Sequence, residues 1–140
     1  MSADAGDRFF DTLGHEQEAG YARAVRRERS IVVSGTTAND GRGGALHAGD
    51  TGAQTSAALR QALAAVEALG GRIDDVVRTR IMLTPAADWR AASHAHAEVF
   101  GAMCPANTTI FVHALVGDDF LVQVEIDAIV ADDEAAVHER

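Results

Sequence analysis

Residues 120–130 alternate apolar and polar side chains more regularly than any other stretch of the chain. Successive side chains of a β-strand point to opposite faces, so this run predicts a strand with one apolar and one acidic face. The apolar positions are Val122, Val124, Ile126, Ala128 and Val130, and the polar positions are Gln123, Glu125 and Asp127. A chain with such a strand needs a sheet that is covered on one face only.

Further runs rich in Val, Ile, Thr and Phe predict the other strands. They span residues 21–25, 31–36, 76–83 and 108–115, and a short additional strand is expected near Leu46.

Two amphipathic helices are expected between the strands. The first begins at Thr51, where Thr-Gly-Ala-Gln fits a capping box, and it stops at Gly70 and Gly71. The second begins at Thr84-Pro85, carries Trp89, His96 and Met103 on an apolar stripe, and ends at Pro105. This order of elements predicts an α+β fold, a sheet with both helices packed on one face.

The uncovered face is expected to carry Thr109, Phe111 and His113 of one strand beside Gln123 and Glu125 of another. This mixture of apolar and polar side chains is typical of a surface used for association, so it predicts contact between subunits.

Charge and composition restrict the function. All twelve basic residues are Arg, and the formal net charge is −9. The absence of Lys excludes Schiff-base chemistry on a lysine and the Walker phosphate loop. The negative charge argues against nucleic acid as the primary ligand.

We expect a single domain over residues 1–140, with its core at about 18–131 and short extensions at 1–14 and from Asp132 onward. The single Cys104 cannot form an internal disulfide, and no apolar run is long enough to cross a bilayer. These features predict a cytoplasmic protein that does not bind membranes.

Metal and nucleophile patterns are weak in this sequence. His94 and His96 stand at i and i+2 of a predicted helix and point to different sides, which argues against a metal site. Ser34 lacks the Gly-x-Ser-x-Gly pattern, and Cys104 has no basic neighbour in the sequence.

Several short motifs occur in order and together resemble the Rid/YjgF family of reactive-intermediate (enamine/imine) deaminases, also labelled endoribonuclease L-PSP. The motifs are Gly20-Tyr21-Ala22-Arg23-Ala24-Val25, Ile31-Val32-Val33-Ser34-Gly35-Thr36, Asp50 to Gln54, Asp75-Val76-Val77-Arg78, Pro105-Ala106 and Val124-Glu125-Ile126-Asp127-Ala128. The resemblance implies a chorismate-mutase-like fold and a homotrimer with a central barrel and ligand clefts between subunits. It also implies hydrolysis of 2-imino or enamino acids to 2-oxo acids and ammonia, without metal or organic cofactor.

The resemblance extends to individual residues. Glu125 matches the family glutamate that positions or activates water, Tyr21 matches a cleft tyrosine, and Ser34 with Gly35 matches a cleft-lining segment. After Pro105-Ala106 the family has an arginine that grips the substrate carboxylate, and this chain has Asn107 there.

The position two residues beyond Asn107, usually a small Cys or similar group, is Thr109. An Asn offers a neutral amide where Arg offers a charged planar fork, so a carboxylate held at this position would lose about tenfold or more in affinity. A different Arg is a possible substitute, and Arg23, Arg78 and Arg80 lie on predicted strands.

The leading hypothesis is therefore a homotrimeric hydrolytic deaminase with no cofactor and no metal, acting on a small enamine or imine other than a simple 2-imino acid. Glu125 is its catalytic residue, and the substrate-binding residues are Tyr21, Ser34, Gly35, Asn107 and Thr109. The alternative is a non-catalytic trimer that binds a small molecule. A ribonuclease fits poorly with the net charge of −9 and with the lack of a catalytic His pair.

Overall fold

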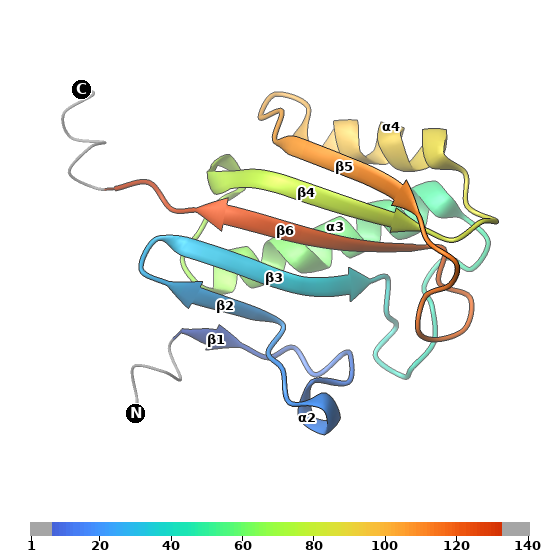
Figure 1. Ribbon diagram of the computed structural model, residues 1–140, viewed down its shortest axis with the longest axis horizontal. Helices are drawn as coiled ribbons and strands as arrows, with labels where there is room; N and C mark the ends of the chain where they lie inside the picture. Colours follow the sequence, from blue (N-terminus) through green and yellow to red (C-terminus); the bar gives the residue numbers. More distant parts are fainter. Residues whose placement is uncertain (1–6, 133–140) are drawn as a thin grey trace.

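The computed structural model describes residues 7–132, which form one six-stranded sheet with helices on one face (Figure 1). The strands are β1 (Arg8–Phe9), β2 (Ala24–Arg27), β3 (Ser30–Thr37), β4 (Val76–Leu83), β5 (Ala106–Phe111) and β6 (Val122–Ile129), and they lie in the order β1-β2-β3-β6-β4-β5. The helices are α2 (Glu16–Ala19), α3 (Thr51–Ala68) and α4 (Trp89–Phe100), with a 3₁₀ turn at Ile73–Asp75.

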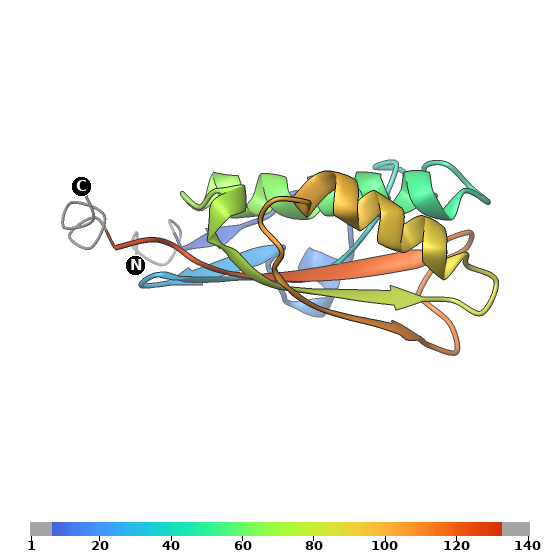
Figure 2. The same ribbon diagram turned by 90° about the horizontal axis from the view of Figure 1, so that it is seen from above.

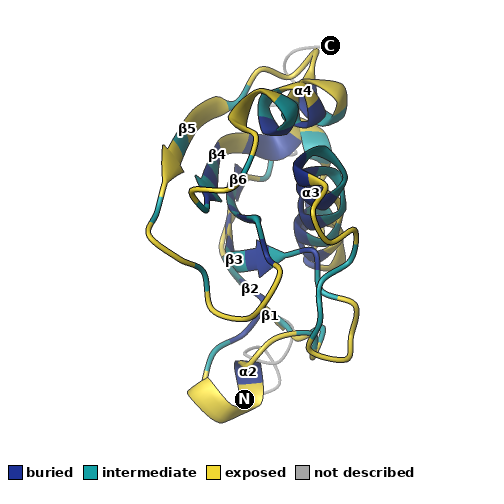
Figure 3. Ribbon diagram, turned by 90° about the vertical axis from the view of Figure 1, so that its right-hand side faces the viewer, coloured by how far each residue is buried: buried dark blue, intermediate teal, exposed yellow. Residues whose placement is uncertain are grey.

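Helices α3 and α4 lie side by side on the same face of the sheet (Figure 2). Buried residues lie on α3, α4 and the central strands, whereas β5 and the connecting loops are largely exposed (Figure 3). The α+β fold with both helices on one face, predicted from the order of elements, is confirmed. The opposite face, which we call the open face, is the one that α3 and α4 leave uncovered.

Strand β6 is central because it pairs antiparallel with β3 on one side and with β4 on the other. Its side chains at Val122, Val124, Ile126 and Ala128 are buried against the helices, as the alternation predicts. Strand β5 extends the sheet beyond β4 and pairs with it in parallel, because α4 returns the chain to the same end of the sheet.

The cap of α3 lies one residue earlier than the predicted capping box. Asp50 is the N-cap, and its carboxylate accepts a hydrogen bond from the Ala53 N–H at 3.0 Å. Gln54, which the sequence pattern placed in the box, is fully buried. Its side chain donates to the Asp119 carbonyl and accepts from the Leu121 N–H, each at 2.8 Å. Gln54 therefore ties α3 to the loop that leads into β6.

The start of α4 is also corrected. The helix begins at Trp89 rather than at Thr84-Pro85, because the Asp88 carboxylate accepts from the N–H groups of Arg90 and Ala91 and caps it there. Trp89 is 46% exposed, so its predicted place in the core is wrong. Phe100 at the other end of the helix is the aromatic residue that fills the core.

Smaller differences occur near the edges. β1 was not predicted, and it forms an edge strand against β2. The strand expected near Leu46 is only an isolated bridge between Asn39 and Ala45. Strand β5 ends at Phe111, four residues before the predicted end. Residues 1–6 and 133–140 of the expected extensions lie outside the described residues, and no helix within 7–132 has the length and apolar character needed to cross a membrane.

The buried amide of Gln54 gives a direct test of this architecture. A Gln54→Leu substitution keeps the side-chain size but leaves the Leu121 N–H and the Asp119 carbonyl without partners. We expect the free energy of unfolding to fall by about 1–3 kcal/mol, measured by urea denaturation. The matched substitution at the exposed Gln17 on α2 is expected to change it by less than about 0.5 kcal/mol. Equal effects of the two substitutions would contradict the proposed tether.

Candidate functional site

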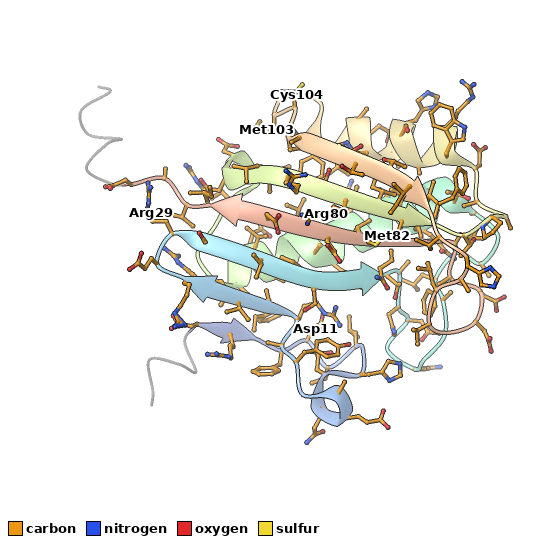
Figure 4. The ribbon with its side chains drawn as sticks, in the orientation of Figure 1. Asp11, Arg29, Arg80, Met82, Met103 and Cys104 are labelled. Carbon is orange, nitrogen blue, oxygen red and sulfur yellow. The ribbon has the colours of Figure 1, made fainter. Side chains whose placement is uncertain are left out.

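Four charged side chains meet at the centre of the open face. Arg80 of β4 lies directly opposite Glu125 of β6, and Arg78 lies opposite Asp127. The Arg80 Nη1 is 3.3 Å from Glu125 Oε1 and 3.3 Å from Asp127 Oδ2. The Arg78 Nε is 4.0 Å from Asp127 Oδ2. Figure 4 shows Arg80 on this face near the middle of the sheet, with Met82 further along β4.

A cavity of about 640 Å³ lies at the end of β3, between the segment before β2, the loop after β3 and the loop before β6, and none of the four charged residues lines it. Tyr21, Gly35 and Gln123 are among the residues that line it. Gln123 and Glu125 are two residues apart on the same face of β6, so Glu125 lies about 7 Å along the strand from the cavity wall. A Cβ at Gly35 would come within 2.5 Å of the Gln123 amide, so glycine allows this close approach.

A buried ion cluster holds one wall of the cavity in place. Arg23 is 4% exposed and lies 3.3 Å from both Asp11 and Glu16. Its Nη1 also donates to the Gly35 carbonyl at 2.7 Å. These contacts link the segment before β2 to β3. The cavity wall that carries Gly35 is thereby fixed by a charged side chain rather than by apolar packing.

Glu16 organises the residues before it. Its carboxylate accepts hydrogen bonds from the backbone N–H groups of Asp11, Thr12 and Gly14 at 3.0–3.1 Å. Burial alone would raise the pKa of Glu16, but these N–H groups and the Arg23 charge outweigh it, so the pKa lies below its usual value. The Tyr21 hydroxyl accepts the His15 N–H at 3.1 Å, which holds the ring beside the same segment.

Ser34 does not line this cavity. Its hydroxyl donates to the Ala22 carbonyl at 2.7 Å and its N–H donates to the Arg23 carbonyl at 2.8 Å. Of the predicted pair Ser34 and Gly35, only Gly35 faces the cavity, and Ser34 joins β3 to the residues that precede β2.

Asn107 and Thr109 lie on the other face of the sheet. They pair with Thr79 and Ile81 of β4, which are buried beneath the helices, and paired residues share a face. With Trp89, Ser93 and Phe111 they line a second hollow, of about 380 Å³, between β5 and α4. The expectation that Thr109 and Phe111 share the face of Glu125 is therefore wrong.

A chain of polar contacts fixes the Asn107 amide. Thr109 Oγ1 donates to Asn107 Oδ1 at 3.0 Å, and Asn107 Nδ2 donates to the buried Thr79 hydroxyl at 3.0 Å. That hydroxyl lies 2.8 Å from His96 Nε2. Burial lowers the pKa of His96, which favours the neutral ring. Asn107 is thus held in one orientation, with an N–H and an oxygen lone pair left for a ligand.

The described residues contain no group of three or more His, Cys, Asp and Glu side chains arranged to hold a metal ion. His94 is exposed and lies apart from the His96 contact with Thr79.

Sequence reasoning named Arg80 only as one of several strand arginines and gave it no place in the site. The signal was available in the matching spacing of Arg78 and Arg80 on one strand and of Glu125 and Asp127 on another. Opposite charges at the same two-residue period favour cross-strand pairs when the strands are neighbours. The sequence of one strand does not show which strands are its neighbours in the sheet. The pairing of these charges therefore becomes evident only from the strand order of the structure.

Acidification should loosen the wall that Glu16 organises. Its lowered pKa means that the stabilising contribution is present above the usual value of 4.5 and is lost as the pH falls through the folded-state pKa. We expect the amide-exchange protection of Thr12 and Gly14 to fall between about pH 6 and about pH 3, measured by NMR after correction for intrinsic exchange rates. Glu16→Gln should lower this protection already at pH 6, whereas Glu18→Gln at an exposed position should not. Protection that stays constant with pH would contradict this role of Glu16.

Comparison with known proteins finds a family model and related sequences that match most of this chain. The family model described as Endoribonuclease L-PSP matches residues 14–131. An uncharacterized protein of Streptomyces coelicolor is 34% identical over 129 residues, covering 91% of this chain and 95% of that protein. A RutC family protein of Pyrococcus horikoshii is 29% identical over 109 residues, covering 78% of this chain and 84% of that protein.

Solved structures also superpose on most of this chain. A member of the YjgF/YER057c/UK114 family from Mycobacterium tuberculosis superposes with a TM-score of 0.78 at 37% identity, covering 88% of this chain and 98% of that one. RidA from an Antarctic Psychrobacter species superposes with a TM-score of 0.73 at 24% identity, covering 89% and 95%, which shows a shared fold. The chain therefore belongs to the endoribonuclease L-PSP family, also known as the Rid/YjgF family.

Proposed function

We propose that this protein is a hydrolytic deaminase of a reactive enamine or imine, with a substrate different from simple 2-imino acids. The observation that carries the proposal is the position of Glu125. Its carboxylate is half-buried on the open face and held by Arg80, two residues along β6 from Gln123, which lines the cavity together with Tyr21 and Gly35. Family membership supports the same reaction class, since Rid proteins are generally enamine/imine deaminases.

The reaction needs one carboxylate that handles protons. Glu125 takes a proton from water as the water oxygen bonds to the carbon of the C=N group, the π electrons move to nitrogen, and Glu125 passes the proton to that nitrogen. The resulting adduct carries a hydroxyl and an amino group on one carbon. Glu125 then takes the hydroxyl proton and delivers it to the amino nitrogen, so that the C–N bond breaks, ammonia leaves and the carbonyl forms. An enamine first takes a proton on its β-carbon to become the imine.

A homotrimer would resolve the division of the candidate residues between two faces. In one protomer Glu125 belongs to the open face and Tyr21 to the cavity, while Asn107 and Thr109 belong to the helix-covered face at the edge strand. A neighbouring copy placed against the open face would bring its own edge strand toward Glu125. Val32 and Ile110 on the open face are about half exposed, and such a contact would bury them.

Asn107 supports a substrate other than the simple 2-imino acids. Its amide is already engaged with Thr79 and Thr109, and its remaining donor and acceptor suit a neutral carbonyl, hydroxyl or ring nitrogen. The family label of endoribonuclease does not guide the proposal, because a net charge of −9 opposes the approach of a phosphate backbone.

Removing the Glu125 carboxylate tests the proposed mechanism. We expect Glu125→Ala to slow ammonia release by about 10²- to 10⁴-fold, the usual contribution of a general acid–base group. Ammonia would be followed on imines generated in situ by an amino-acid oxidase and on 2-aminomuconate-type enamines. Glu98→Ala, which removes an exposed carboxylate from α4, should leave the rate unchanged. Wild-type rates no better than those of Glu125→Ala on every compound would refute the catalytic proposal.

The alternative function is a trimer that binds a small molecule without turning it over, and Asn107 is the observation that favours it. Asn107→Arg separates the two. If the protein is a deaminase that lacks only the arginine that binds the substrate carboxylate, this substitution at an exposed position should raise the rate of ammonia release from 2-imino acids about tenfold. The variant's mass should remain near three times 14.7 kDa by light scattering. Continued inactivity of such a trimer would favour the binding function.

A further inference from the structure

We propose that His96, acting through Thr79, fixes which end of the Asn107 amide a ligand meets in the hollow between β5 and α4. His96 is then a positioning residue, because it does not itself line the hollow. The inference rests on the proposed function for the part that Asn107 plays in the site. It adds the kind of group that Asn107 binds and the residue that decides it.

The register of the sheet and the core packing bring these side chains together. Thr79 of β4 is paired with Asn107 of β5, and its side chain is fully buried. The His96 ring reaches Thr79 from α4, and its centroid lies 4.8 Å from that of the buried Phe100 ring. The polar groups therefore follow one another from the edge strand to the helix, in the order Thr109, Asn107, Thr79 and His96.

The buried hydroxyl of Thr79 determines the direction of this chain. It accepts a hydrogen from Asn107 Nδ2 at 3.0 Å, and its one other polar contact within residues 7–132 is His96 Nε2 at 2.8 Å. The hydroxyl hydrogen therefore goes to Nε2, which must be an acceptor, so the hydrogen of the neutral ring is on Nδ1. At the other end, the Thr109 hydroxyl donates to Asn107 Oδ1 at 3.0 Å.

This direction decides what a ligand meets at Asn107. Thr79 holds the nitrogen end of the amide and Thr109 holds the oxygen end, so one N–H and one oxygen lone pair remain in fixed places. A ligand group beside Thr109 meets the oxygen and must donate a hydrogen, as the amino group of an enamine or a hydroxyl does. A carbonyl or an imine nitrogen suits the nitrogen end instead. None of the residues that line the hollow is charged, so it favours a neutral group.

A hydrogen on His96 Nε2 reverses the chain. The ring then donates to Thr79, and the buried hydroxyl hydrogen can go only to the Asn107 side chain, which must present its oxygen. Asn107 is exposed, so its amide can rotate by half a turn without disturbing the core. The amide nitrogen then donates to Thr109, and the donor and the acceptor offered to a ligand exchange places. Every contact in the chain is kept, which makes the two arrangements alternatives.

The surroundings of His96 favour the first arrangement at neutral pH. Burial lowers the pKa of the ring, and no charged group contributes to this shift. The charged and titratable side chains on the elements around it are exposed or lie on the open face. They are Arg60 and Glu67 of α3, Asp88, Arg90, His94 and Glu98 at α4, Arg78 and Arg80 of β4, and Glu125 and Asp127 of β6, and β5 has none.

NMR spectroscopy of the ligand-free protein tests the chain. Ring nitrogen chemical shifts report which nitrogen of His96 carries hydrogen, and we expect a bare Nε2 at neutral pH. The side-chain amide signals of Asn107, assigned by their loss in Asn107→Ala, should shift on acidification with the same midpoint as the His96 ring. This midpoint should lie below the usual value of 6.5.

Substitutions at Thr79 separate the chain from a general effect of pH. Thr79→Val removes the hydroxyl from a side chain of nearly the same shape, and Asn107 should no longer follow His96. Thr79→Ser restores the hydroxyl and should restore the common titration. His94→Gln, the matched control at an exposed position of α4, should leave it unchanged. If Thr79→Val fails to fold, His96→Phe keeps a ring against Phe100 and should abolish the Asn107 shift.

Three outcomes would overturn the inference. They are a hydrogen on His96 Nε2 at neutral pH, Asn107 signals that do not follow His96 in the wild type, and a common titration that persists in Thr79→Val. These measurements need no substrate, so they are independent of ammonia release. A chain that behaves as expected in a protein that releases no ammonia would refute the deaminase but keep this inference. Ammonia release by a protein whose Asn107 ignores His96 would do the reverse.

Discussion

The position of β6 at the centre of the sheet is the constraint on which both the fold and the candidate site depend. Antiparallel pairing with β3 and β4 fixes its register from two sides. The register that buries Val124 and Ile126 under the helices also places Glu125 opposite Arg80 on the open face. A shift of one residue would exchange these two sets of side chains. The apolar core therefore stabilises the geometry of the charged cluster as well as the fold.

The open face combines two polar systems of different kinds. The Arg80 cluster is half-exposed, so its ion pairs contribute little to stability and remain available to a ligand. The Arg23 cluster is buried, and loss of one partner there would leave a charge uncompensated in the interior. We interpret the buried cluster as the support of the cavity wall and the exposed one as the chemical centre.

The sequence predicted those features that depend on the pattern within one segment. The bounds of β4, residues 76–83, agree with the predicted run, and the alternation of β6 gave both of its faces. Helix α3 begins at Thr51 as predicted, although Asp50 rather than a capping box caps it. Helix α4 begins at Trp89 rather than at Thr84-Pro85, because the Asp88 side chain caps it there. Trp89 matched an apolar helix position but lies at the first turn, beyond the part of α4 that packs on the core.

Features that depend on pairing between segments were not predictable in this way. Asn107 and Thr109 are two residues apart, so a strand places them on the same face, but which face that is follows from the parallel register with Thr79 and Ile81. The same limit kept Arg80 from being assigned to Glu125. The functional roles of Glu125, Tyr21, Ser34, Gly35, Asn107 and Thr109 remain proposals drawn from the family resemblance.

We propose that the chemistry takes place on the open face, at Glu125. Backbone amide chemical shifts, mapped during titration with a 2-oxo acid, check this placement. We expect the shifts to concentrate on β4 and β6 around Arg80 and Glu125 and to extend to the cavity at Gly35. Shifts confined to the hollow between Trp89 and Phe111, with Arg80 and Glu125 unchanged, would contradict it.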